Sequence, residues 1–157
     1  MIDRARPRYA PARSLPTRAF LPGVSPASDR PAEAPHRRDA LPDDLAADET
    51  FRFGVDLYNH GFPWEAHEAW EALWHAAPHG SASRLLLQGL IQAAAAAVKA
   101  RSAQWSGARK LATSAAELLH GAGDVAGIRG EALAMALEAW CHHAEHGAAV
   151  PPIVLAV

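Results

Sequence analysis

Two stretches decide the fold: residues 62–74 read FPWEAHEAWEALW, and residues 82–100 read ASRLLLQGLIQAAAAAVKA. In both, apolar residues recur every three or four positions, which is the spacing of an amphipathic α-helix. Pro63 stands at the first-turn position that proline favours, and a short loop separates the two stretches. The sequence therefore predicts two antiparallel helices, over about Pro63–Ala77 and Ala82–Ala100.

The same periodicity continues on both sides of this pair. The chain holds 37 alanines among its 157 residues, and alanine is the best helix former. Few strongly apolar or β-branched residues remain to build a large sheet. We expect an all-α fold, a single bundle of about five antiparallel helices, with a glycine-rich turn over Gly121–Gly127. The three further helices are expected over Asp44–His60, Gly107–His120 and Ile128–His146.

Composition divides the chain into three parts. Residues 1–42 carry eight of the twelve prolines and a net charge of +4, whereas residues 43–157 carry −6. Frequent prolines forbid regular helix, so residues 1–42 are predicted to form an arm, disordered or docked on the body. Docking would use Leu15–Pro26, and the anchors would be Tyr9, Leu15, Phe20, Leu21 and Val24. Residues 43–147 are the predicted helical domain, and residues 148–157 an extended apolar tail.

The same counts argue against several classes of protein. An acidic body does not suit nucleic-acid binding, which needs clustered positive charge. No apolar stretch reaches the roughly 20 residues of a membrane span, and the first residues lack the apolar core of a signal peptide. Cys141 stands alone, so we expect a packing residue in a cytoplasmic protein.

A polar pair borders the apolar stripe of the first stretch. On a helical projection, His67 and Glu71 are an i,i+4 pair at the edge of that stripe, with Trp64 and Trp74 on either side. A tryptophan-flanked position is seldom fully solvated. We therefore expect His67 and Glu71 to be partly buried, with Glu68 nearer the rim.

The second stretch carries a matching polar strip, formed by Arg84, Gln88, Gln92 and Lys99 along one edge of its core-facing side. Strips of acceptors and donors that both border a core are expected to face each other, because buried carboxylates need partners. This interpretation predicts a pocket between the second and third helices.

Three interpretations of the pocket stay open. His67 and Glu71, joined by Glu68, would hold a divalent metal, although H-E-x-x-E lacks the second histidine of the zincin pattern. Alternatively, the pocket is metal-free and His67 transfers protons with Glu71 or Glu68. In the third interpretation the strip only fixes the helix register. If Arg84 or Lys99 entered the pocket, its positive charge would replace that of a metal.

The run from Phe53 to Trp74, with its A-H-E-x-W-E-x-L-W core, resembles a family of small helical domains, domain of unknown function 309. The block Leu87–Gln92, followed by Lys99, resembles the second conserved block of that family. The resemblance implies a small all-α bundle similar to helical-hairpin arrays, with no established activity. It supports His67, Glu68, Glu71, Gln88 and Gln92 as the positions of interest.

We therefore expect a cytoplasmic helical domain with a His/Glu/Gln pocket, hydrolase-like or acting by proton transfer on a small polar molecule. His67 would be the base or a metal ligand, Glu71 its orienting group or co-ligand, and Glu68 a second acid. The substrate would contact Gln88, Gln92, Arg84, Lys99, Trp64 and Trp74. The alternative is a non-enzymatic module that binds a protein partner, and the sequence leaves both catalysis and homo-oligomerisation open.

Overall fold

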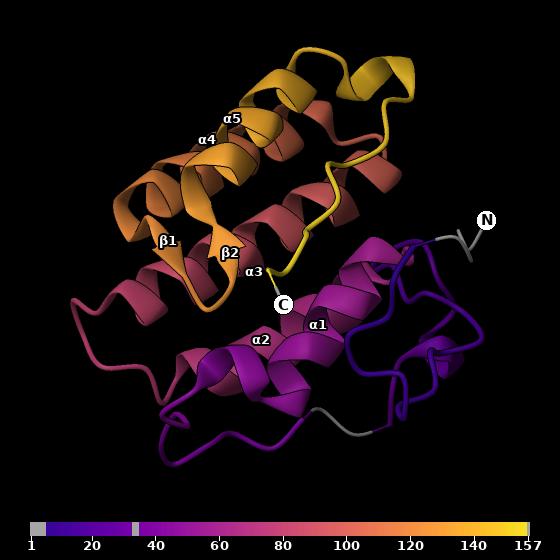
Figure 1. Cartoon of the computed structure of the whole chain (residues 1–157). Helices are drawn as coiled ribbons and strands as arrows, with labels where there is room; N and C mark the ends of the chain where they lie inside the picture. The colour runs from indigo at the N-terminus through magenta and orange to yellow at the C-terminus, as the bar shows by residue number, and fades with distance from the viewer. Residues whose placement is uncertain (1–5, 33–34, 157) are drawn as a thin grey trace.

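The computed structural model describes residues 6–32 and 35–156, and in this part of the chain five α-helices form one bundle (Figure 1). Each helix packs on the next one along the sequence, so that α3 lies between α2 and α4. The predicted all-α bundle is confirmed. The helices are α1 (Glu49–Asn59), α2 (Pro63–Trp74), α3 (Ala82–Arg101), α4 (Trp105–Ala122) and α5 (Gly130–Cys141).

The first helix begins five residues later than expected. The Asp48 side chain accepts a hydrogen bond from the Phe51 amide and so caps α1. Asp44 does the same for a separate 3-10 turn, Leu45–Ala47. Two capping aspartates therefore divide a segment that periodicity alone presents as one helix.

A short hairpin replaces the predicted glycine-rich turn. Helix α4 runs on to Ala122, and β1 (Asp124–Val125) then pairs antiparallel with β2 (Ile128–Arg129). Ala126 and Gly127 both have positive φ, as a tight two-residue hairpin turn requires. The fifth helix consequently begins at Gly130, two residues later than predicted.

The fifth helix is also shorter at its other end. It stops at Cys141, and a separate 3-10 turn, Ala144–His146, ends at Gly147 in the left-handed conformation. Cys141 is buried in a small cluster with Trp140 and Ala144, where it packs against alanines of α3 and α4.

The arm is docked on α1 and α2 (Figure 1). The Asp56 carboxylate is fully buried and accepts hydrogen bonds from Arg8 Nε and from the Tyr9 and Ala10 amides. Phe20 is buried as predicted, but Val24 is 61% exposed and anchors nothing. Residues 1–5 and 33–34 of the predicted arm lie outside the described residues.

The C-terminal tail returns to α1. The Asn59 side chain donates to the Ile153 carbonyl at 2.7 Å and accepts from the Ile153 amide at 2.8 Å. Ile153 and Leu155 are buried, whereas Val157 lies outside the described residues. In the described ranges, the helices fall short of the length and apolarity needed to cross a bilayer.

Candidate functional site

Helix α2 carries three potential metal ligands on one face. His67, Glu68 and Glu71 each offer a nitrogen or oxygen atom, and these three atoms lie within 4.8 Å of one another. His67 Nδ1 is 3.5 Å from Glu68 Oε1, and His67 Nε2 is 3.9 Å from Glu71 Oε2. The H-E-x-x-E spacing produces this cluster because residues three and four apart share a helix face.

The imidazole of His67 is held by packing. Its ring stacks on the indole of Trp64, with a centroid separation of 5.4 Å and an interplanar angle of 22°. Its Nδ1 atom is buried, and the contact with Glu68 lacks hydrogen-bond geometry. Stacking thus fixes the orientation of the His67 ring, and its buried Nδ1 has no hydrogen-bond partner. A histidine that is ready to bind a ligand has both features.

Exposure ranks the two carboxylates in the order opposite to the prediction. The side chains of His67 and Glu68 are 22% and 24% exposed, whereas that of Glu71 is 42% exposed. The arm explains the difference, because it covers the side of α2 on which Glu68 lies. A second histidine, His75, lies next to the other end of the cluster, with its Nε2 atom 3.8 Å from Glu71 Oε1.

The basic residues of the predicted strip point elsewhere. Arg84 stacks over Trp74 at 4.2 Å and donates to the Trp74 and Ala77 carbonyls, where it caps the end of α2. Lys99 donates to Gln104 Oε1 near the other end of α3. Among the described residues, neither Lys nor Arg forms an ion pair with Glu68 or Glu71.

Gln88 and Gln92, the two glutamines of α3, are both half-buried. Gln92 Oε1 is buried without a hydrogen-bond partner. Within the described ranges, no hydrogen bond joins Gln88 or Gln92 to His67, Glu68 or Glu71. The glutamines therefore do not hydrogen-bond to the cluster, and their contact with a substrate stays a prediction.

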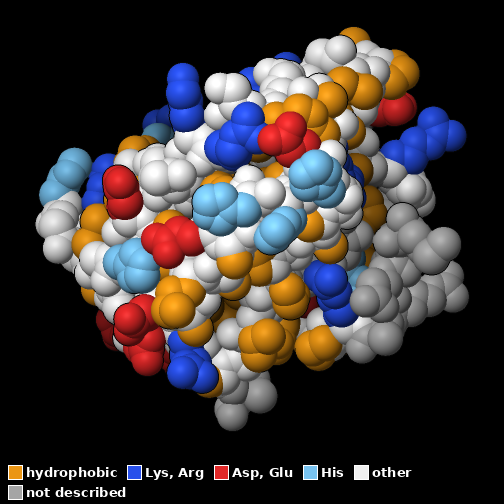
Figure 2. Space-filling view, turned by 90° about the horizontal axis from the view of Figure 1, so that it is seen from above, with side chains coloured by type: hydrophobic (Ala, Val, Ile, Leu, Met, Phe, Trp, Pro, Cys, Tyr) orange, Lys and Arg blue, Asp and Glu red, His pale blue; other side chains and the backbone are white. Residues whose placement is uncertain are grey.

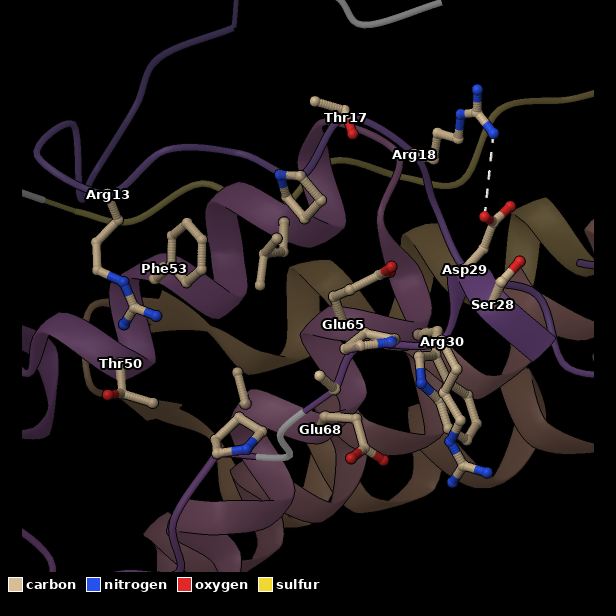
Figure 3. Close-up of a pocket in the computed structure, with 17 residues that line it drawn as sticks. Arg13, Thr17, Arg18, Ser28, Asp29, Arg30, Thr50, Phe53, Glu65 and Glu68 are labelled. Atoms are coloured by element: carbon tan, nitrogen blue, oxygen red, sulfur yellow. Dashed lines mark ion pairs between the residues drawn. The ribbon is translucent and has the colours of Figure 1, made fainter. Parts of the chain in front are cut away.

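A pocket of about 720 Å³ opens beside the cluster, between the arm and helices α1 and α2. Figure 3 shows Glu65 and Glu68 of α2 in this pocket, with Arg18, Asp29 and Arg30 of the arm opposite them. Arg18 and Asp29 form a long ion pair of 3.9 Å. Sequence reasoning missed this pocket, because half of its wall comes from an arm without periodic structure.

Glu65 is a further residue that sequence reasoning passed over. Its Oε1 accepts the Phe20 amide at 2.8 Å, while its Oε2 is buried and unpartnered. Burial raises the pKa of Glu65 above its usual range, against the opposing effects of the Phe20 hydrogen bond and of Arg101. Glu65 thus joins the arm to α2 at the wall of the pocket.

The C-terminal histidines form a separate, exposed group. Figure 2 shows histidine side chains gathered on the face over α4 and α5, among acidic and basic groups. His142, His143 and His146 are exposed there, and the nearby Glu138 and Glu145 pair with His120 and Arg109. Across the described part of the chain, the cluster with three ligands close together is the one on α2.

Comparison with known proteins supports the predicted resemblance. No curated protein and no solved structure matches the chain. Residues 51–111 match the model of one protein family. They include most of α1, all of α2 and α3, the start of α4 and the whole His67 cluster. This part of the chain resembles the family described as domain of unknown function (DUF309).

Proposed function

We propose that His67, Glu68 and Glu71 bind a divalent cation and that this cation serves a hydrolase-like site at the arm pocket. The observation that carries the proposal is the convergence of three ligand atoms within 4.8 Å, without a lysine or arginine ion pair to either carboxylate in the described residues. Two neighbouring carboxylates repel each other, and a cation relieves that repulsion.

The positions of the basic residues support a metal over the metal-free alternative. A site that works without metal needs another source of positive charge beside its carboxylates. Arg84 and Lys99 were the candidates for that role, and both are engaged outside the cluster. Arg18 and Arg30 of the arm line the pocket with Glu68, but among the described residues neither forms an ion pair with it. A protonated His67 would also supply positive charge, but it would lose its capacity to act as a base.

The ligand set indicates which cations fit. One imidazole nitrogen and two carboxylate oxygens suit Zn²⁺, Mn²⁺ or Fe²⁺ better than Ca²⁺, which prefers oxygen ligands alone. Three protein ligands leave coordination positions for water, and a bound cation lowers the pKa of such water. Glu68 also lines the arm pocket, so a small polar substrate in that pocket would lie beside the cation.

The test is calorimetric titration of the chelator-treated protein with Zn²⁺ and with Mn²⁺. We expect one site with a Kd of about 1 μM or lower, equivalent to about 8 kcal/mol. His67→Ala and Glu71→Gln should each weaken binding at least about tenfold, or about 1.4 kcal/mol. His142→Ala, which removes an exposed histidine outside the cluster, is the matched control and should bind as the unaltered protein does.

Equal binding by the His67→Ala/Glu71→Gln double variant and the unaltered protein would overturn the proposal. For the hydrolytic step, chromogenic carboxylate and phosphate esters are assayed before and after chelation. Activity that disappears with the cation and returns when it is restored supports the assignment. Hydrolysis by the double variant at the original rate refutes it.

The alternative, a module that binds a protein partner, finds support in a different region. A mainly apolar pocket of about 390 Å³ lies between α5, β2 and the tail, and Met135 and Val154 are exposed in these elements. Among the described residues, this region holds no cluster of metal-ligating side chains, so the metal site remains the leading proposal. Location in the cytoplasm stays a prediction from the lone cysteine.

A further inference from the structure

A second pocket, of about 300 Å³, lies on another side of α1 and does not include the His67 cluster. Its wall combines Arg6 of the arm, the end of α1, the end of α3, the start of α4, and the end of α5 with the chain that follows it. These segments extend from Arg6 to Val150, so the pocket exists only in the folded protein.

Two buried polar side chains of this wall have no partner. Tyr58 is 2% exposed and His60 is 4% exposed. The Tyr58 hydroxyl and both ring nitrogens of His60 are buried and make no hydrogen bond. Buried polar groups without partners are rare and costly, so two of them on one pocket wall indicate a polar ligand.

The charge of the wall indicates the sign of that ligand. Arg6 and Arg101 line the pocket, and its lining holds no aspartate or glutamate. Arg6 donates to the Asn59 carbonyl at 3.0 Å, and Arg101, whose side chain is exposed at the pocket, donates to the Gly61 carbonyl at 2.7 Å. The groups available to a ligand are therefore mainly hydrogen-bond donors, which favours an anion.

The rest of the wall is mainly apolar. It is lined by Trp105 and Trp140, by five alanines, and by Pro63 and Val150. The Trp140 ring is fixed, because its Nε1 donates to the Ala148 carbonyl at 3.0 Å. Aromatic walls with a few placed polar groups are typical of small-molecule sites, and this volume is at the small end of their range.

We propose that this pocket binds a small planar carboxylate, with the carboxylate at Tyr58, His60 and Arg101 and the apolar part against Trp105 and Trp140. The hydroxyl of Tyr58 donates one hydrogen bond and the imidazole of His60 a second. Burial raises the pKa of the Tyr58 phenol above its usual range, although Arg6 acts in the opposite direction, so the phenol keeps its proton and remains a donor. This site is independent of the cation site on α2.

The test is NMR titration of the full chain with benzoate, followed through the indole N–H signals of the tryptophans. The signals of Trp105 and Trp140 should shift and saturate. That of Trp70 should not, because Trp70 is buried in the core and does not line this pocket. Benzamide has the same shape without the charge, so we expect it to bind about tenfold more weakly.

Tyr58→Phe removes only the unpartnered hydroxyl, so it should weaken benzoate binding about fivefold to tenfold without lowering the thermal midpoint. Tyr9→Phe is the matched control: Tyr9 is the other tyrosine and lies outside this pocket, so benzoate binding should be unchanged. Arg101→Gln should weaken benzoate but leave benzamide unaffected.

Three results would each overturn the proposal. These are unchanged Trp105 and Trp140 signals at saturating benzoate, equal affinity for benzoate and benzamide, and equal benzoate affinity of Tyr58→Phe and the unaltered protein. The signal of Trp64, which stacks on His67, reports separately on the cation site. Failure of one site is therefore distinguishable from failure of the other.

Discussion

Asp56→Asn tests whether one buried carboxylate keeps the arm docked. The docked arm forms part of the wall of the 720 Å³ pocket, so the pocket depends on this carboxylate as well. The Oδ2 atom accepts from Arg8 Nε and the Ala10 amide, both at 2.9 Å, and Oδ1 accepts from the Tyr9 amide at 2.8 Å. All three partners are donors. Asparagine preserves the shape of the side chain but turns one acceptor into a donor, so at least one of the three hydrogen bonds must be lost.

The magnitude follows from the best arrangement that asparagine can adopt. With its oxygen at the Oδ2 position it keeps two hydrogen bonds, now to a neutral acceptor, and places its amide against the Tyr9 N–H. A hydrogen bond to a charged group contributes about 1.5–3 kcal/mol, against about 1 kcal/mol for a neutral one. We expect arm docking to weaken by about 3 kcal/mol, or roughly a hundredfold in its opening equilibrium.

Hydrogen exchange measures this change directly, since the Phe20 amide is bonded to Glu65 only while the arm is docked. Exchange at Phe20 should accelerate about a hundredfold, while that of core α3 amides stays nearly constant, because the arm opens without unfolding the bundle. Asp29→Asn is the control, since its 3.9 Å ion pair with Arg18 is at the surface and contributes little. Unchanged exchange at Phe20 in Asp56→Asn would refute this account of docking.

Three further predictions concern α1 and α2, and urea unfolding measures each of them. His67→Ala should leave the midpoint unchanged or raise it, as expected for a functional site, whereas a loss of about 2 kcal/mol would indicate a structural network. Burial raises the pKa of Glu65 in the folded state above its reference value of 4.5. The free energy of unfolding therefore falls as the pH rises from 4.5 through this raised pKa, because the unfolded chain gives up the proton more readily. Glu65→Gln should therefore match the unaltered protein below pH 4.5 and exceed it at neutral pH, and a difference that does not depend on pH would contradict this. A Cβ at Gly54 would overlap the indole of Trp70, so Gly54→Ala should cost about 2 kcal/mol despite its gain in helix propensity. Gly121→Ala, with 3.6 Å to its nearest neighbour, should instead gain about 0.5–1 kcal/mol, and equal effects of the two substitutions would refute the packing argument.

The helices could be predicted from sequence because their signals are local. Apolar spacing, Pro63 at the start of α2 and the alanine content all act within a few residues. The predicted helix ends were less accurate. A cap such as Asp48 or a hairpin such as Val125–Ile128 moves the end of a helix by only a few residues and leaves the apolar periodicity intact. Where a helix stops depends on side-chain geometry more than on the apolar pattern.

The long-range contacts had no comparable signal. Asp56 meets the arm across 46 to 48 residues, and Asn59 meets the tail across 94. Both occur on the buried side of α1, where a polar residue looks like an interruption of the apolar face. The pocket at Tyr58 and His60 needs five separate segments, so no window of sequence contains it. The sequence shows that Asp56 and Asn59 are polar residues in an apolar helix. It does not show that their partners lie in the arm and in the tail.

The cluster on α2 illustrates the limit of treating a helix in isolation. Projection placed Glu71 beside the core and Glu68 near the rim, because it considered the apolar stripe of α2 alone. The arm adds a second covering surface on the Glu68 side, which reverses the exposure of the two carboxylates. The two carboxylates of the proposed cation site therefore lie in different surroundings. The Glu68 side faces the arm pocket, which would hold the substrate of the proposed site. The Glu71 side is the more exposed one, with His75 3.8 Å away, and the cation would enter from there.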